Sequence, residues 1–302
     1  MALESHCFAR TLLGKKENIM KHLFKRTVVL LNDFKTIDTL LKKAIDFSTQ
    51  HHTTLEILYV HEKGLFEIPD YFLSEEKITD EESDKGKIKE RIEEHLDALN
   101  VKEKMAILVY EEDSVERVLH HAKGQKEILF MTAYHAELSP KLLQKTPHTF
   151  WIVKKSILTY KNMVLPFDFS ENGRKTLQAT QHIFAEHPLT MVHDYRYILD
   201  TLTIQVDYLN VLPLLTDEVL EINRRLKKEQ QAKFEAYKKE FHVEGDCIEG
   251  EGALDKDLIE YISQRDFDLT ILYHQNEELF LSPSLILELL KGLETDFFIF
   301  NF

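Results

Sequence analysis

The sequence predicts an α/β protein made of two tandem doubly wound domains, each with a mainly five-stranded parallel sheet flanked by helices. Three observations lead to this fold class. Short apolar runs alternate with segments of helical periodicity along the whole chain. An apolar run ends in an aspartate followed by a phenylalanine twice, at Asp33 and at Asp168. The two aspartates are 135 residues apart (168 − 33), and a repeat of that length is a duplicated domain rather than a solenoid.

The first half alternates strands and helices from residue 27 onward. The run "TVVLL" at 27–31 is continuous and β-branched, which is typical of a strand buried on both faces. A helix is expected next, because Ile37, Leu40 and Leu41 follow helical spacing. The charged stretch 74–87 is expected to be a solvated loop before an amphipathic helix. Strands are expected at 27–31, 54–60, 104–110, 127–133 and 148–153.

The second half repeats this order with one addition. Its longest helix is expected near 217–240, and 194–216 is an insertion rich in Leu, Ile, Val and Tyr. The insertion is either an extra element that seals a core edge, or a lid or partner surface, because long unstructured loops are uncommon. Strands are expected at 162–167, 189–193, 242–248, 268–273 and 296–302.

These patterns divide the chain into an N-terminal extension and two domains. The domains are predicted at 26–156 and 160–302, with the insertion inside the second. Residues 1–25 lack a continuous hydrophobic region, so they are interpreted as a flexible or loosely docked extension rather than a signal peptide. The alternatives are a short docking helix, or residues upstream of a natural start at Met20.

Composition narrows the class of partner. The formal net charge is −14, which disfavours nucleic acid and anionic lipid surfaces. No apolar run approaches the roughly 20 residues of a membrane helix. Cys7 and Cys247 are far apart and outside any metal-binding spacing, as expected for a cytoplasmic protein.

Several segments of the second half resemble the universal stress protein family in its tandem, two-domain form. They are "MVLPFDFSENGRKTL" (163–177), a strand ending in Val192-His193, "IEGEGALDKDLIEYI" (248–262) and "DLTILYH" (268–274). The resemblance implies an adenine nucleotide alpha hydrolase-like fold, with ligands beyond the carboxyl ends of the strands.

The resemblance also implies a role for the two aspartates. In nucleotide-binding members, the aspartate after the first strand contacts the adenosine, which corresponds to Asp168 and, less closely, to Asp33. The residues alone leave another interpretation open. Each aspartate could instead accept hydrogen bonds from nearby backbone N–H groups, with Ser170 capping the next helix.

The phosphate-binding part of the family pattern is missing in both halves. Nucleotide-binding members have Gly-x-x-Gly after the fourth strand and a later Gly-Ser or Gly-Thr, whose bare amides wrap phosphates. Here the corresponding residues are Ala133-Tyr134-His135-Ala136 and Leu272-Tyr273-His274-Gln275, and the later pair is Pro283-Ser284. We therefore expect no cofactor, and ATP or AMP binding in the usual family mode is disfavoured.

Other polar residues can be placed near the same sheet edges. Gly250 and Gly252 precede a helix but are surrounded by acidic residues, so a structural turn is favoured over an anion site. Histidines end strands at His61 and His193 and follow strands at His135 and His274. Packing is favoured over metal binding, because no third ligand is evident. The candidate ligand-binding residues are Asp33, Asp168, Ser170, His193, Gly250, Gly252, His274 and Ser284.

The last strand of each half is apolar and would lie at a sheet edge, where an unpaired strand attracts another. We expect 148–153 to pair with 296–301, which would give an intramolecular pseudo-dimer.

Neither a catalytic triad order nor a Walker lysine is present, so the chain is not expected to be an enzyme. The function predicted is a non-enzymatic role in stress-response regulation or protein interaction, with a protein or small molecule as partner. Two alternatives remain. One is a nucleotide-binding sensor or weak ATPase that uses Asp168 or Asp33. The other is a carrier of a small apolar ligand under 194–216.

Overall fold

The computed structural model of the chain describes residues 23–61, 75–101, 105–194, 216–249, 254–274 and 283–302. The chain divides into two compact units, Met1–Thr159 with Ile299–Phe302, and Tyr160–Phe298. Each unit is described by itself below. The domain boundaries from sequence, 26–156 and 160–302, stay a prediction, as does the pairing of 148–153 with 296–301.

The first unit contains a five-stranded sheet in the order β3-β2-β1-β4-β5. The pairs β1–β2, β2–β3, β1–β4 and β4–β5 are all parallel. Its strands are β1 (Arg26–Leu31), β2 (Thr54–His61), β3 (Ala106–Glu111), β4 (Ile128–Ala133) and β5 (Thr149–Val153). Chain order reverses between β1 and β4, so the sheet is doubly wound, as the sequence predicts.

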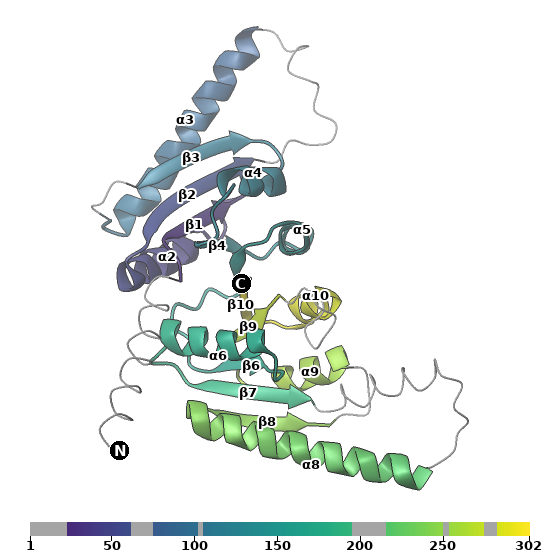
Figure 1. Cartoon of the computed structure of the whole chain (residues 1–302). Helices are drawn as coiled ribbons and strands as arrows, with labels where there is room; N and C mark the ends of the chain where they lie inside the picture. Colours follow the sequence, from purple (N-terminus) through teal and green to yellow (C-terminus); the bar gives the residue numbers. More distant parts are fainter. Residues whose placement is uncertain (1–22, 62–74, 102–104, 195–215, 250–253, 275–282) are drawn as a thin grey trace. The chain divides into compact units, whose positions relative to one another are not determined.

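Helices cover both faces of this sheet (Figure 1). They are α2 (Ile37–His51), α3 (Glu75–Ala98), α4 (Ser114–His121) and α5 (Leu138–Lys145). Right-handed crossovers place α2 and α3 on one face and α4 and α5 on the other. In agreement, α2 contacts α3, and α4 contacts α5.

The second unit repeats this arrangement, with strand order β10-β9-β6-β7-β8. The pairs β6–β7, β6–β9 and β7–β8 are parallel. Its strands are β6 (Met163–Pro166), β7 (Leu189–Asp194), β8 (Glu244–Ile248), β9 (Leu269–Tyr273) and β10 (Asp296–Phe300). Its helices are α6 (Glu171–Ile183), α8 (Thr216–Phe241), α9 (Leu254–Ser263) and α10 (Pro283–Gly292).

The cores of both units lie between the sheet and its helices. The central strands β1, β4, β6 and β9 are buried along nearly their whole length, as expected for parallel strands covered on both faces. The helices contribute one apolar stripe each; in α2 it includes Ile37, Leu40, Leu41 and Phe47. The described helices include none that is long and apolar enough to cross a membrane.

One sequence prediction is wrong. The stretch 74–87 was expected to be a solvated loop, but α3 begins at Glu75 and continues through it to Ala98. Its glutamates and lysines are strong helix formers that need no apolar face. Asp84 and Lys87 also form an i,i+3 ion pair of 2.9 Å on this helix. The low apolar content therefore indicated exposure and not loss of helical structure.

Candidate functional site

The predicted aspartate of the second unit lies at the point where strand order reverses. β6 has β7 on one side and β9 on the other, and the chain leaves β6 at Pro166 and reaches Asp168 two residues later. Ser170 then caps α6, because its hydroxyl accepts a hydrogen bond of 3.0 Å from the Gly173 N–H. Ligands of doubly wound sheets bind at this edge, so Asp168 is in the expected place.

The Asp168 carboxylate is already engaged by the protein. Its Oδ1 accepts hydrogen bonds from the Ser170 N–H at 2.9 Å and from the Tyr273 hydroxyl at 2.5 Å. The Ser170 hydroxyl donates to the same oxygen. The Asp168 N–H donates to the Tyr273 hydroxyl at 3.3 Å. Asp168 is only 8% exposed, so one carboxylate oxygen is used internally and largely shielded from solvent.

Tyr273, at the end of β9, completes this cluster and is fully buried. Burial and the adjacent Asp168 carboxylate raise the pKa of the Tyr273 hydroxyl well above its usual value. The phenol therefore stays protonated and acts as a hydrogen-bond donor.

Gly173 makes the close approach of these groups feasible. A Cβ at this position would lie 2.7 Å from Asp168 Oδ1 and 2.9 Å from the Tyr273 hydroxyl oxygen. Both distances are shorter than van der Waals contact, so the first turn of α6 needs a residue without a side chain here.

The second oxygen of Asp168 behaves differently. Oδ2 is buried and has no hydrogen-bond partner in the described part of the chain. A buried carboxylate oxygen without a donor is unfavourable, so this atom is the one feature of Asp168 that suits a ligand.

His193 at the end of β7 belongs to the same cluster. Its Nδ1–H donates a hydrogen bond of 2.8 Å to the Phe167 carbonyl, and its ring lies 4.5 Å from that of Phe169. The pKa of His193 is lowered mainly by burial, against opposing effects of the Phe167 carbonyl, Asp194 and Asp168. These contacts are of the packing and backbone hydrogen-bonding kind that the sequence interpretation favoured, and a ligand-binding role for His193 stays a prediction.

The remaining candidates of the second unit are not brought into this cluster by any described contact. Burial lowers the pKa of the His274 imidazole, and Ser284 lies exposed in the first turn of α10. Gly250, Gly252 and the residues 195–215 and 275–282 lie outside the described residues.

The equivalent edge of the first unit is built differently. Asp33 is partly exposed, and its Oδ1 accepts a hydrogen bond of 2.9 Å from the Lys35 N–H, which is the local turn that the residues alone allowed. Phe34 packs against Tyr59 with ring centroids 5.3 Å apart, and the Arg91 guanidinium lies 4.1 Å from the Phe34 ring centroid. Aromatic and guanidinium groups therefore occupy the space next to Asp33.

In the first unit, two amides of the loop that corresponds to the family's phosphate-binding loop are already engaged. The Tyr134 N–H donates to the Val153 carbonyl at 2.9 Å, and the His135 N–H donates to the Ser139 hydroxyl at 2.9 Å. An amide that is already bonded within the protein cannot bind a phosphate oxygen without breaking that bond.

Sequence reasoning missed Tyr273 as a site residue, although it was visible. It ends β9, a strand that pairs directly with β6, so its hydroxyl lies at the same sheet edge as Asp168. A tyrosine and an aspartate at the ends of neighbouring parallel strands would have predicted the contact. No cluster of three or more His, Cys, Asp or Glu side chains in the described ranges could hold a metal ion.

The fold and this edge define a doubly wound α/β protein. Comparison with solved structures makes this more specific. A universal stress protein from Archaeoglobus fulgidus DSM 4304 matches with a TM-score of 0.57 and 9% identity, covering 92% of this chain and 97% of that one. A functionally unknown protein from Pseudomonas aeruginosa PAO1 matches with a TM-score of 0.55 and 13% identity, covering 93% and 94%.

The chain thus has the fold of universal stress proteins, and these matches extend over nearly its entire length. The resemblance inferred from short motifs is confirmed at the level of the fold. No protein-family model matches the sequence, and no curated protein matches it.

Proposed function

We propose that the chain is a non-enzymatic protein of stress-response regulation that acts through protein interactions and does not bind ATP in the mode usual for universal stress proteins. The fold likeness supports the stress-response class, and the state of Asp168 supports the absence of the usual nucleotide mode. The biological role is inferred from the likeness of the fold. The absence of the usual nucleotide mode is inferred from the contacts of Asp168.

The observation that carries the proposal is the hydrogen bond from Tyr273 to Asp168. A nucleotide that used Asp168 Oδ1 as its acceptor would have to displace the buried Tyr273 hydroxyl and leave that hydroxyl without its acceptor. In the first unit, the engaged Tyr134 and His135 amides act in the same direction. The Tyr273–Asp168 bond and the engaged amides both oppose nucleotide binding. This argument is independent of the absence of the Gly-x-x-Gly pattern.

Thermal unfolding with and without nucleotide tests the proposal. A ligand present at about 100 times its dissociation constant adds about 2.7 kcal/mol of stability. We expect no change in Tm with about 5 mM Mg-ATP, ADP or AMP, a concentration that would reveal sub-millimolar binding. Release of phosphate from ATP at the rate of a buffer blank is the matching activity readout.

A rise in Tm with any nucleotide would contradict the proposal. The variant Asp168→Asn then identifies the site, because the amide oxygen still accepts from Tyr273 and Ser170 while the charge is removed. A shift that disappears in this variant places the nucleotide at Asp168, and one that persists places it elsewhere.

One observation favours nucleotide sensing as the second candidate function. Asp168 Oδ2 is buried without a donor among the described residues, so a ribose hydroxyl or a base amine could supply one. The outcome of the unfolding experiment decides between the two functions.

The protein partner would dock on the 194–216 insertion in our proposal. Nearly all of it lies outside the described residues, so the test is made on the chain itself. Replacing 195–215 by a short Gly/Ser linker should abolish capture of the partner in a quantitative co-purification. Unchanged capture would exclude the insertion as the interaction surface. A carrier function under the same insertion stays an alternative prediction.

A further inference from the structure

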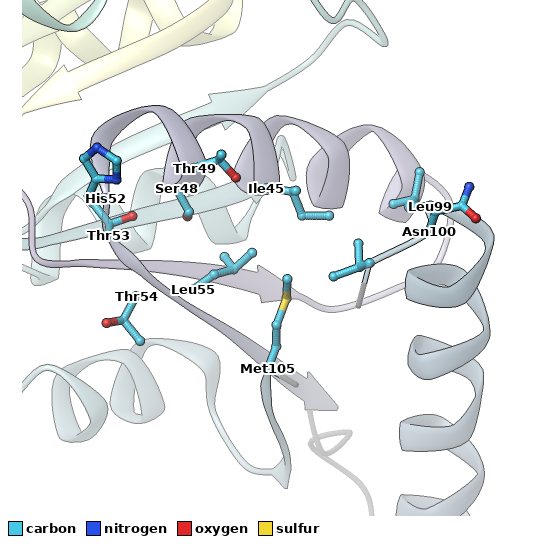
Figure 2. A pocket seen from close by; sticks show the side chains of 11 residues that line it. Ile45, Ser48, Thr49, His52, Thr53, Thr54, Leu55, Leu99, Asn100 and Met105 are labelled. Carbon is cyan, nitrogen blue, oxygen red and sulfur yellow. The ribbon is translucent and has the colours of Figure 1, made fainter. Parts of the chain in front are cut away.

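The first unit contains a pocket at the end of its sheet where the strands begin, which is opposite to the end that carries Asp33. It lies between the C-terminal ends of α2 and α3 and the first residues of β2 (Figure 2). Its volume is about 650 Å³, within the range of about 300–1,000 Å³ that small-molecule sites occupy.

This pocket is remote from the edge where ligands of this fold are expected. Thr54 and Leu55, which begin β2, line it. His61 ends β2, and Asp33 follows the end of the parallel neighbour β1. A strand rises about 3.3 Å per residue, so the eight residues of β2 separate the two edges by about 25 Å. Binding here would be independent of any nucleotide.

The lining combines an apolar patch with polar groups. Ile45, Leu99, Val101 and Met105 line the pocket and are each only partly buried, so apolar surface remains open to it. The polar part consists of hydroxyl, amide and imidazole side chains. Among the described lining residues there is no Asp, Glu, Lys or Arg.

Ser48 provides a specific polar contact point. It is 8% exposed, and its hydroxyl has no hydrogen-bond partner within the described structure. Ser48 lines the pocket, and Figure 2 shows its side chain on the side of α2 that faces Thr54 and Leu55. A buried hydroxyl without a partner is unfavourable, and a ligand that bonds to it would relieve that cost.

Two helix ends add an electrostatic preference. α2 ends at His51 and α3 at Ala98, and each is followed by a left-handed residue that lines the pocket, His52 (φ 55°) and Asn100 (φ 58°). The C-terminal end of a helix carries a partial negative charge, which favours hydrogen-bond donors and disfavours carboxylates.

We propose that this pocket binds a small uncharged molecule with an apolar body and a hydroxyl group. The apolar patch would hold the body, and the Ser48 hydroxyl would pair with the ligand hydroxyl.

The test uses the full chain and two matched probes, 2-phenylethanol and phenylacetate, which share an aromatic body and differ in hydroxyl against carboxylate. Backbone amide shifts in NMR spectra report binding residue by residue. For 2-phenylethanol we expect saturable shifts confined to residues 48–55 and 99–101, with a dissociation constant on the order of 1–10 mM. Phenylacetate should bind at least about tenfold more weakly.

Two variants assign the binding to the pocket. Thr49→Trp adds a ring at an exposed lining position and should abolish the shifts, whereas Gln50→Trp adds the same ring at an exposed position of α2 outside the lining and should preserve them. Ser48→Ala should weaken 2-phenylethanol by about three- to tenfold. Amide spectra of the free variants confirm that each is folded.

Three results would overturn the inference. One is the absence of saturable shifts with up to about 50 mM 2-phenylethanol, which would mean that the pocket holds only water. Another is unchanged binding to Thr49→Trp. The third is equal affinity for phenylacetate, which would contradict the chemistry proposed for the lining.

Discussion

The Tyr273 hydroxyl donates a 2.5 Å hydrogen bond to the Asp168 carboxylate across two neighbouring strands, 105 residues apart in sequence. Both side chains are buried. This contact links the end of β9 to the start of α6, and it occupies one oxygen of the carboxylate at the sheet edge where ligands of doubly wound folds bind. The stability of the second unit therefore depends on this pair, and our proposal that the usual nucleotide mode is absent rests on the same contact.

The first prediction concerns Tyr273→Phe. Removing the hydroxyl leaves a buried carboxylate with one donor fewer, so the free energy of unfolding of the second unit should fall by about 1–3 kcal/mol. Urea denaturation measures the change. Tyr110→Phe is the control, since it retains the ring that packs against Arg117 and should change stability by less than about 0.5 kcal/mol. Equal effects of the two variants would contradict the role given to the Asp168 contact.

The second prediction compares two helical glycines. Gly173→Ala places a Cβ 2.7 Å from Asp168 Oδ1 and should destabilise by about 1–3 kcal/mol through overpacking. Gly86→Ala in α3 meets no atom within 4 Å and should stabilise by up to about 1 kcal/mol through helix propensity. Chemical denaturation of both variants measures whether the free energy of unfolding falls for Gly173→Ala and rises for Gly86→Ala. A stabilising Gly173→Ala would show that the cluster can open to admit a methyl group.

The third prediction is a pH dependence that comes from His193. Burial lowers the pKa of His193 below 6.5 in the folded state. Between this lowered pKa and about pH 6.5, the unfolded chain therefore binds a proton at His193 that the folded chain does not. The resulting stability is present above about pH 6.5 and is lost as the pH falls through the lowered folded pKa.

His193→Asn isolates this effect, because the amide N–H can replace the Nδ1–H that bonds to the Phe167 carbonyl. Calorimetric Tm values at about pH 7.5, 6.5 and 5.5 should fall more steeply for the native chain than for the variant. Burial lowers the pKa of His121, His148 and His274 in the same direction. Parallel curves for the native chain and His193→Asn would show that His193 contributes nothing to the dependence.

The fourth prediction addresses the proposed pairing of the fifth strands. Ile152 is fully buried in β5, so Ile152→Lys should disrupt the first unit. If β5 pairs with β10, amide hydrogen exchange in 296–300 should speed up as well, while exchange in β6 at 163–166 stays slow. Mass spectrometry of peptides from both segments measures this. Unchanged exchange in 296–300 would exclude the pairing.

The order of strands was predictable from sequence because each strand is a short buried apolar run. All ten expected strands are present, with ends that differ by one or two residues, as for β6 at Met163–Pro166 against the expected 162–167. The ends of a strand are set by its hydrogen bonds to neighbouring strands. The sequence of one apolar run carries no information about those neighbours. The N-terminal part of α3 was missed because its residues have no apolar period, although their helix propensity is high.

The position of the candidate site was predictable from sequence, but the internal hydrogen bonds of Asp168 were not. Asp168 and Ser170 could be placed at the sheet edge because they follow a recognisable strand. That Oδ1 is engaged depends on Tyr273, which reaches it only through the strand order. The pocket at the opposite edge depends on how two helix ends and a strand leave space between them, and no local pattern encodes that shape.

The contacts around Asp168 also restrict how this chain can change during evolution. Loss of Tyr273 alone leaves a carboxylate short of a donor, and loss of Asp168 alone leaves a buried phenol without its acceptor. A larger residue at Gly173 collides with both. The three positions therefore constrain one another, and a descendant in which Tyr273 no longer engages Asp168 is expected to be less stable than this chain.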